Sequence, residues 1–445
     1  MPPRFSLVIP TFNRSDLFPY TVQSILNQTF EDFEIVLSDN CSSDDTPEVA
    51  RQFKDPRFKY VRTPRHLTIA DNCEFVRMQA SGRSIILLSD DDALVESALG
   101  HFQQQAERHG ADFLFSRVVE YYDQSWPRSD RNSVICPAFS GISRPVSKEE
   151  FVGPFCAFRP KFHLHPSAFA FSKSVADWVA RKTGRFFWTN GVEYSAWLSM
   201  ALFAKGIVYI DLPLTIKGHS TKSWTTNISL YNPGKEQIQK LMKDVDTERM
   251  PTPLNNFTMC NLMAEGILLA KRQFPEELAP YEFNEVNYLR KTMAELRRRR
   301  AMGVDVSAEM EEALRYSQKY PSLSEEFSSQ DWGKQLFRRI RSTVADLGGR
   351  TVRRRLNAYQ LRYKLRRGPM RSGFTAYGED FGFNDIVGCA KFIDRIIRSN
   401  LVRDDSMPMF TPIIGSREVC SVHRRNPTSQ NLVTSFFSWL SSLLP

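Results

Sequence analysis

The sequence has no apolar run that could cross a membrane as a helix. No stretch approaches the roughly 18 consecutive apolar residues that such a helix requires. The chain opens on MPPRFSLVIP, which enters an apolar run almost at once and lacks the two regions of a secretory signal peptide. We therefore expect a cytoplasmic protein, and peripheral association with the inner face of a membrane stays open.

Cysteines are few and scattered. There are seven, an odd number, and no two of them form a C-x-x-C pair. Disulfide frameworks and structural zinc sites both depend on closely spaced cysteines, so the pattern argues against both. A reducing compartment fits this usage.

Negative charge is scarce in one segment, and that is where positive charge gathers. Residues 334–371 contain thirteen lysines and arginines against a single acid, Asp346, whereas the whole chain has a formal net charge of +9. The rest of the chain is therefore close to neutral. The segment is suited to an anionic membrane surface, to a solvated helix face or, as the least favoured choice, to nucleic acid. Charge alone does not identify the partner.

The last residues, 431–445, carry no charge and place apolar side chains on one side of a helix. Such a helix can lie in a bilayer interface, particularly when a basic segment supplies a second attachment. Packing on the helical part of the chain, or on a second copy in a homodimer, is the alternative.

Short apolar runs alternate with helical patterns through the first half of the chain. They lie at residues 5–10, 33–39, 58–62, 84–88 and 112–123. Continuously apolar runs are typical of strands that are buried on both faces. This predicts a doubly wound α/β fold with a mainly parallel sheet, whose ligands bind beyond the carboxyl ends of the strands.

Beyond about residue 235, apolar residues recur at helical spacing, as in Val286, Leu289, Met293 and Leu296. We therefore expect four parts along the chain. They are an α/β domain at 1–235, a helical appendage at 236–333, the basic segment at 334–371 and a C-terminal helical region at 372–445.

Acidic residues gather where strands of the predicted sheet end. Asp39 ends one apolar run, and Asp90, Asp91 and Asp92 follow another. Adjacent carboxylates repel each other unless a cation lies among them, and Mg²⁺ or Mn²⁺ commonly joins such groups to a substrate diphosphate. An exposed acidic turn without a role is the alternative, but the buried-strand pattern before the triplet disfavours it.

Three segments carry a resemblance to a known family. They read FSLVIPTFNRSDLFPYTVQSILNQTFEDFEIVLSDNCSSDDT, SGRSIILLSDDDALV and GVEYSAWLSMALFAKGIVYIDLPLTIKGHSTKSW. In this order they resemble the opening, the acidic metal-binding motif, and the acidic helix with its following strand and histidine in family 2 glycosyltransferases. The resemblance covers residues 5–225, about half of the chain.

This resemblance implies a GT-A fold that binds a nucleotide-diphosphate sugar. By position, Pro10, Thr11 and Asn13 would frame the nucleotide, with Arg14 nearby. Asp39 would accept a hydrogen bond from the base, which is most often uracil in the family.

The resemblance also assigns the triplet. Asp90 and Asp91 would approach the ribose and the metal, Asp92 would be the first choice of metal ligand, and His219 would complete the metal shell or contact the diphosphate. The family usually has an acid where Ser89 stands. The alignment of the triplet with the family motif can therefore be shifted by one residue, and so can the role of each aspartate. For His219, an ordinary surface histidine is a close alternative.

The helix before the triplet offers two further candidates. Asn72 and Arg77 could contact the nucleotide, but a capping or surface role explains either residue equally well.

Glu193 is the candidate general base. Many members of the family have an acidic pair here, whereas this chain has Val192-Glu193-Tyr194. One carboxylate is sufficient to take a proton from an acceptor hydroxyl, and a metal on the phosphate oxygens would stabilise the leaving group. A base opposite the leaving group predicts inversion at the anomeric carbon. The alternative is that Glu193 is not catalytic and only stabilises the N-terminus of a helix through the helix dipole.

We therefore expect an inverting, metal-dependent glycosyltransferase. It would use Mn²⁺ or Mg²⁺ and a nucleotide-sugar donor, with UDP as the first choice. Its acceptor would be a glycan or a lipid-linked sugar in cell-surface polysaccharide synthesis. A GT-A-like binding module that has lost catalysis is the alternative. A nucleotidyltransferase is disfavoured because IPTFNRSD contains no glycine-rich phosphate loop.

Overall fold

The computed structural model describes residues 1–126, 130–189, 191–223, 252–256, 258–301, 303–328, 354, 357–362 and 373–401. Most of the basic segment 334–371 and the whole tail 431–445 lie outside these residues, so the membrane, nucleic-acid and dimer interpretations of those segments stay predictions. The six cysteines in the described part are free thiols. No helix among the described residues is long and apolar enough to span a membrane.

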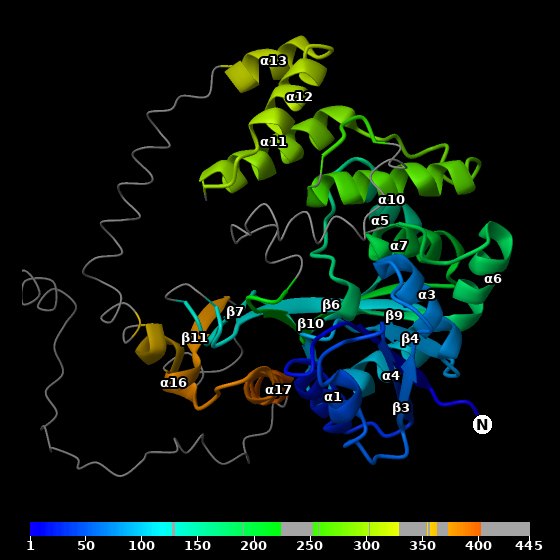
Figure 1. Cartoon of the computed structure of the whole chain (residues 1–445), viewed down its shortest axis with the longest axis vertical. Helices are drawn as coiled ribbons and strands as arrows, with labels where there is room; N and C mark the ends of the chain where they lie inside the picture. Colours follow the sequence, from blue (N-terminus) through cyan, green and yellow to red (C-terminus); the bar gives the residue numbers. More distant parts are fainter. Residues whose placement is uncertain are drawn as a thin grey trace, which may run out of the picture. The chain divides into compact units, whose positions relative to one another are not determined.

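Four parallel strands form one half of a large sheet (Figure 1). In spatial order they are β4 (Ser84–Leu87), β1 (Phe5–Thr11), β2 (Phe33–Asp39) and β3 (Phe58–Arg62). The helices that alternate with them are α1 (Phe18–Leu26), α2 (Thr46–Ala50) and α3 (Ile69–Gln79).

These strands are continuously apolar because their two faces enter two different cores. Leu7 and Ile9 of β1 belong to one buried cluster, whereas Val8 between them belongs to the other. Successive side chains of a strand point to opposite faces, so a sheet covered on both sides needs apolar residues at every position. The predicted α/β class is confirmed.

The other half of the sheet is mixed. Strand β9 (Phe169–Ser172) runs antiparallel between β4 and β6 (Phe113–Tyr122), and β10 (Ile207–His219) runs parallel to β6. Short antiparallel strands complete this half. They are β5 (Ala93–Leu94), β7 (Ser133–Cys136) and β8 (Ser143–Val146). The helical segments of this region are α4 (Ala98–His109), α5 (Lys148–Cys156), η1 (Pro166–Ala168), α6 (Lys173–Thr183) and α7 (Val192–Phe203).

The described residues of the part expected to be a helical appendage form four helices joined by turns and loops, and this part packs directly on the α/β part. It consists of α10 (Met259–Gln273), α11 (Glu285–Ala301), α12 (Ser307–Ser317) and α13 (Pro321–Ser328). Helix α10 packs on α7, where a Cβ added to Gly266 would lie 2.6 Å from the Cβ of Tyr194. One buried cluster therefore continues from Phe113 of the sheet to Leu296 of α11.

The C-terminal region contributes a strand as well as helices. Strand β11 (Phe374–Tyr377) pairs antiparallel with β7 and is followed by α16 (Gly378–Phe381). Helix α17 (Ile386–Leu401) packs against α1, β5 and β10. The carboxylate of Asp394 accepts hydrogen bonds from the backbone and side chain of Ser97 at the start of α4. These residues thus complete the α/β unit although they lie far along the chain.

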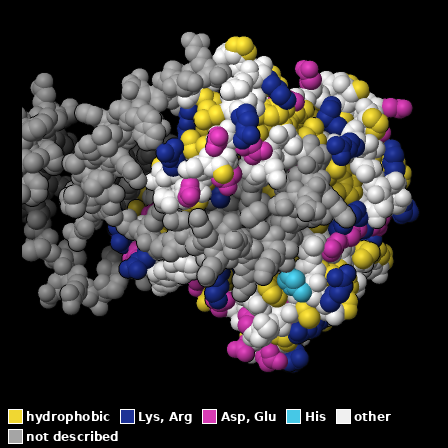
Figure 2. Space-filling view, turned by 45° about the horizontal axis from the view of Figure 1, so that its top comes forward, with side chains coloured by type: hydrophobic (Ala, Val, Ile, Leu, Met, Phe, Trp, Pro, Cys, Tyr) yellow, Lys and Arg dark blue, Asp and Glu magenta, His cyan; other side chains and the backbone are white. Residues whose placement is uncertain are grey.

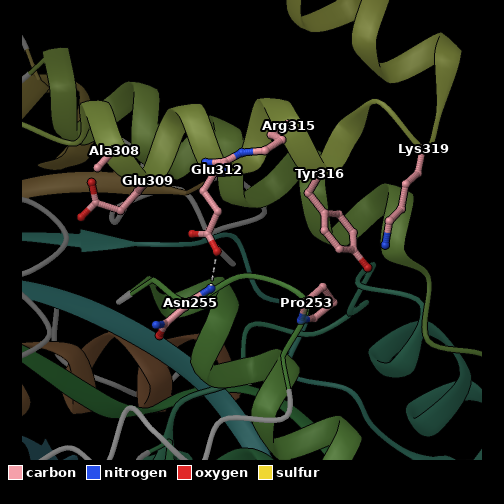
Figure 3. A pocket seen from close by; sticks show the side chains of 8 residues that line it. All are labelled: Pro253, Asn255, Ala308, Glu309, Glu312, Arg315, Tyr316 and Lys319. Atoms are coloured by element: carbon pink, nitrogen blue, oxygen red, sulfur yellow. Dashed lines mark hydrogen bonds between the residues drawn. The ribbon is translucent and has the colours of Figure 1, made fainter.

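The surface of the described part does not present one sign of charge. On the face shown in Figure 2, lysine and arginine side chains are interspersed with aspartate and glutamate. An open cavity of about 680 Å³ lies between α12 and residues 253–255, and Glu312 accepts a hydrogen bond from the backbone of Asn255 across it (Figure 3). None of the predicted site residues lines this cavity.

Candidate active site

The carboxyl ends of β1, β2 and the segment after β4 meet at one edge of the sheet, as the sequence predicted. Pro10 and Thr11 end β1, and Thr11 lies in register with Asp39 of β2. The Thr11 hydroxyl donates a hydrogen bond of 2.7 Å to Asp90 Oδ2. Three distant segments of the sequence therefore meet at one edge of the sheet.

Asp39 is fully buried and held by three donors. The Ser42 amide and the Tyr60 hydroxyl donate to its two carboxylate oxygens, and Arg62 lies 3.3 Å away. Burial and this carboxylate raise the pKa of Tyr60 to about 12, so the phenol stays a donor. Asn13, with a left-handed φ of 54°, connects β1 to the loop after Asp39, since its side chain accepts from the Ser43 amide.

The three aspartates of the triplet have three different environments. Asp92 is 1% exposed, and its carboxylate accepts hydrogen bonds from the Gly218 amide (3.0 Å) and the Ser167 hydroxyl. His165 Nδ1 lies 3.5 Å from the same carboxylate. Asp90 and Asp91 are more accessible, with 13% and 11% of the side chain exposed.

Burial raises the pKa values of two aspartates of the triplet. It raises the pKa of Asp90 to about 6 even though Arg14 opposes the shift. Burial, together with the charge of Asp91, raises the pKa of Asp92 well above its usual value. A positive group placed among the three carboxylates would remove this cost.

Arg14 lies beside two of these carboxylates. Its Nη1 atom is 3.5 Å from Asp90 Oδ1 and 3.7 Å from Asp91 Oδ2, and its Nη2 atom donates to the carbonyl of Lys222. Burial alone would lower the pKa of Arg14, but the two aspartates outweigh it and the pKa is raised. Nη1 is buried without a hydrogen-bond partner.

The predicted metal ligands do not form one cluster. Within the described residues, no three or more His, Cys, Asp or Glu side chains are grouped as metal ligands. Both carboxylate oxygens of Asp92 accept hydrogen bonds from the protein. Asp90 and Asp91 instead each place a carboxylate oxygen near Arg14 Nη1, an atom without a hydrogen-bond partner. A divalent cation that takes most of its ligands from a diphosphate and water needs only one or two carboxylates. Asp90 and Asp91 fit such a cation.

The side chain of His219 is buried and contacts other protein side chains. It is 2% exposed, its ring stacks on Tyr122 with centroids 4.7 Å apart, and its Nε2 atom is bonded to Glu120. Lys217 and His163 also lie within 3.7 Å and 3.6 Å of the Glu120 carboxylate. Although burial favours the neutral acid, these partners hold the pKa of Glu120 well below its usual range.

Glu193 is the second residue of α7, and no other side chain is hydrogen-bonded to it in the described part of the chain. Burial raises its pKa to about 7, against the opposing effects of its own backbone amide and the charge of Lys217. A carboxylate whose pKa is near the working pH is ionised in a large fraction of the molecules and is still a strong enough base to take a proton. This is the property that a general base needs.

Asn72 and Arg77 are both buried in α3. Asn72 accepts a 2.7 Å hydrogen bond from Ser38, and Arg77 forms ion pairs with Glu74 and Asp177. These contacts support a structural role for Arg77. A nucleotide contact by Asn72 stays a prediction.

Several residues of the site were missed in the sequence. Lys217 and Gly218 stand in the motif TIKGH, of which only the histidine was singled out. A Cβ added to Gly218 would lie 1.9 Å from the carbonyl oxygen of Asp91, so only glycine fits there. His165 and Ser167 stand in HLHPS, which has no acidic signal, although two histidines so close together could have drawn attention.

Comparison with known proteins identifies the family. Residues 6–178 match the family model described as glycosyl transferase family 2. The chain is 36% identical over 121 residues to GalNAc(5)-diNAcBac-PP-undecaprenol beta-1,3-glucosyltransferase of Campylobacter jejuni, a match covering 26% of this chain and 39% of that one. It is 26% identical over 204 residues to UDP-Glc:alpha-D-GlcNAc-diphosphoundecaprenol beta-1,3-glucosyltransferase WfaP of Escherichia coli, covering 45% and 71%.

A longer match is with the uncharacterized protein MT1568 of Mycobacterium tuberculosis. It is 30% identical over 235 residues, covering 51% of this chain and 70% of that one. Among solved structures, S. aureus TarS 1–349 in complex with UDP-GlcNAc aligns over 74% of this chain and 93% of its own, with 12% identity and a TM-score of 0.43. The residues of the family match include β1, β2 and the triplet. The chain belongs to glycosyltransferase family 2, and residues 6–178 lie in its glycosyltransferase domain.

Proposed function

We propose that the protein transfers a sugar from a nucleotide-diphosphate donor, a UDP-sugar in the first place, to a hydroxyl of a glycan or lipid-linked acceptor, with inversion. Two observations support the proposal. Thr11, Asp39, Asp90 and Asp91 share one sheet edge, and Glu193, at the start of α7, is a carboxylate with a pKa of about 7.

On the donor side, Pro10, Thr11, Asn13 and Asp39 would frame the nucleotide. The assignment of Asp39 to the base is supported by its place at the end of β2, where ligands of such sheets bind. Because Ser42, Tyr60 and Arg62 already fix its carboxylate, Asp39 is held in one orientation.

The cation side would be formed by Asp91 and Asp90. Asp91 replaces Asp92 as the preferred ligand because Asp92 is engaged by Gly218 and Ser167. Mn²⁺ or Mg²⁺, when bound with the diphosphate, supplies the positive charge that stabilises the leaving group. Arg14 would contribute its own charge beside the same carboxylates.

The base side would be Glu193. As the acceptor oxygen bonds to the anomeric carbon, the bond from that carbon to the phosphate oxygen breaks and the nucleoside diphosphate leaves. The hydroxyl proton passes to Glu193. Attack opposite the leaving group inverts the anomeric centre, so an α-linked donor gives a β-linked product.

The acceptor class is supported by names of relatives. The Campylobacter jejuni and Escherichia coli enzymes are named for undecaprenol-diphosphate-linked sugars, and a 29% identical Bacillus subtilis protein, GgaA, is named for minor teichoic acid biosynthesis. We propose a similar role in cell-surface polysaccharide synthesis. The protein would work in the cytoplasm, at the inner face of the membrane, where residues 334–371 and 431–445 would provide attachment.

A screen of nucleotide sugars for thermal stabilisation, with and without Mn²⁺, tests the donor. Ligands that bind the folded state alone raise its apparent stability by mass action. A UDP-sugar that stabilises the protein more in Mn²⁺, and whose sugar is then transferred to a diphospholipid-linked acceptor with inverted configuration, supports the proposal. Absence of any nucleotide-sugar effect would refute it.

A further inference from the structure

Arg14 carries a positive charge beside the two carboxylates that are proposed to hold the cation. Its Nη1 atom is 3.5 Å from Asp90 Oδ1 and 3.7 Å from Asp91 Oδ2, and only 16% of its side chain is exposed. Nη1 has no hydrogen-bond partner among the described residues. The guanidinium group therefore compensates the charge of both carboxylates at close range, while Nη1 leaves their lone pairs free of a hydrogen bond from this atom.

Contacts with the segment after β10 hold Arg14 in this position. Its Nη2 atom donates a hydrogen bond of 2.5 Å to the carbonyl oxygen of Lys222. The Lys222 ammonium group in turn pairs at 2.6 Å with Asp16, which stands two residues after Arg14. The loop after β1 and the segment after β10 thus bind each other at two points. The guanidinium group cannot leave the two carboxylates without breaking its bond to the Lys222 carbonyl.

A guanidinium group so close to the carboxylates affects any metal cation that they bind. Arginine has donors and no acceptor, so it cannot be a metal ligand, and two positive charges at short distance repel each other. A diphosphate changes this balance. Its oxygens bind a divalent cation and also accept hydrogen bonds from a guanidinium group, so that both positive groups can share one anion.

We propose that Arg14 makes binding of the divalent cation depend on the donor. Mn²⁺ or Mg²⁺ alone binds Asp90 and Asp91 weakly, because Arg14 already compensates their charge and repels a second cation. The diphosphate of the donor offsets this repulsion, and the cation and the donor then bind together. The inference rests on the proposed function, because it requires a cation and a diphosphate at the edge that carries Asp90 and Asp91.

The test is the affinity of the full-length protein for Mn²⁺ at about pH 8, with and without UDP, followed by electron paramagnetic resonance of the free ion. Arg14→Gln removes the charge and keeps an amide that can donate to the Lys222 carbonyl. We expect this variant to bind Mn²⁺ alone at least about tenfold more tightly than wild type. The factor by which UDP raises the Mn²⁺ affinity should be at least about tenfold smaller in the variant, and UDP itself should bind more weakly. Arg14→Lys, which keeps the charge, should bind Mn²⁺ alone as weakly as wild type.

Arg51→Gln is the matched control. Arg51 follows α2, pairs with Glu48 at 3.1 Å, and has 65% of its side chain exposed. The substitution changes the net charge by the same amount as Arg14→Gln, but away from the two aspartates, so its Mn²⁺ and UDP affinities should match those of wild type. If Arg14→Gln fails to fold by circular dichroism, Arg14→Met replaces it in the same measurement.

The outcomes separate this inference from the proposed function. A wild type that does not bind UDP refutes the proposed donor, and a wild type whose UDP affinity is the same with and without Mn²⁺ refutes the proposed cation. If wild type binds both together but Arg14→Gln binds Mn²⁺ alone no more tightly, the inference is wrong and the proposed function stands. Weaker binding of both Mn²⁺ and UDP in Arg14→Gln would indicate a structural role and would also refute the inference. So would an equal tightening in Arg14→Lys or in Arg51→Gln, because the charge beside the aspartates would then not be the cause.

Discussion

At the scale of single residues, neighbours in the sequence have separate roles. Asp91 and Asp92 are adjacent, yet Asp92 accepts hydrogen bonds from Ser167 and Gly218 while Asp91 lies beside Arg14 and is 11% exposed. The sequence could predict that the triplet lies at a sheet edge, because an apolar run precedes it. It could not predict which carboxylate is enclosed, because Ser167 and Gly218 follow Asp92 by 75 and 126 residues in the sequence.

Alanine substitutions separate these roles. Asp91→Ala should weaken binding of the UDP-sugar in Mn²⁺ at least about tenfold, since one carboxylate ligand is lost, with little change in stability. Asp92→Ala should instead lower the free energy of unfolding by about 1–3 kcal/mol, because the Gly218 amide and Ser167 hydroxyl lose their acceptor. Calorimetric titration measures the donor affinity, and denaturant unfolding measures the free energy of unfolding. If Asp92→Ala weakened donor binding and Asp91→Ala lowered stability, Asp92 would be the metal ligand instead.

The raised pKa of Glu193 also predicts a pH-dependent stability. The folded protein binds this proton more tightly than the unfolded chain, with a pKa of about 7 against 4.5, so stability from this group falls as pH rises through that interval. Glu193→Gln mimics the neutral form. It should match wild type near pH 4.5 and exceed it above pH 7 by about 1–3 kcal/mol. Thermal unfolding at both pH values checks this, and equal stability at pH 8 would contradict the buried setting of Glu193.

At the scale of elements, the site depends on close backbone contacts. The parallel strands were predictable because their apolar runs are continuous. The contact of β10 with the triplet was not, because it rests on the absence of one side chain at Gly218.

Gly218→Ala should therefore disrupt the site. The new Cβ would lie 1.9 Å from the Asp91 carbonyl oxygen, which no rotamer can relieve, so β10 must move away from the triplet. We expect a loss of about 2–4 kcal/mol in stability and of most donor binding. Gly100→Ala in α4 is the control, since its Cβ would meet nothing within 4 Å. There the helix should gain up to about 1 kcal/mol. Equal effects of the two substitutions would show that the close contact is absent in solution.

At the scale of the whole molecule, the glycosyltransferase unit extends beyond the family match. The match ends at residue 178, yet β11 adds to the sheet and α17 packs on α1 and β10. Sequence patterns predicted helices in this region but not the strand. A four-residue strand carries little periodicity, and its partner β7 lies more than two hundred residues earlier.

Truncation tests this extension. A chain that ends at residue 371 lacks β11 and α17, so the apolar residues of α1, β5 and β10 that pack against α17 lose this cover. We expect it to aggregate or to lose its cooperative thermal transition. A chain that ends at residue 403 keeps every described residue and should unfold as the full chain does. Normal folding of the shorter chain would mean that the C-terminal elements are dispensable.

The central claim is that Glu193 acts as the base opposite a donor held at the Asp39 and Asp91 edge. The direct test is the turnover of Glu193→Gln with the UDP-sugar found by screening, alongside its donor affinity. The expected result is a fall in kcat of at least about a thousandfold with donor affinity within about twofold of wild type, since general-base catalysis contributes roughly that much. Turnover close to that of wild type would contradict the assignment.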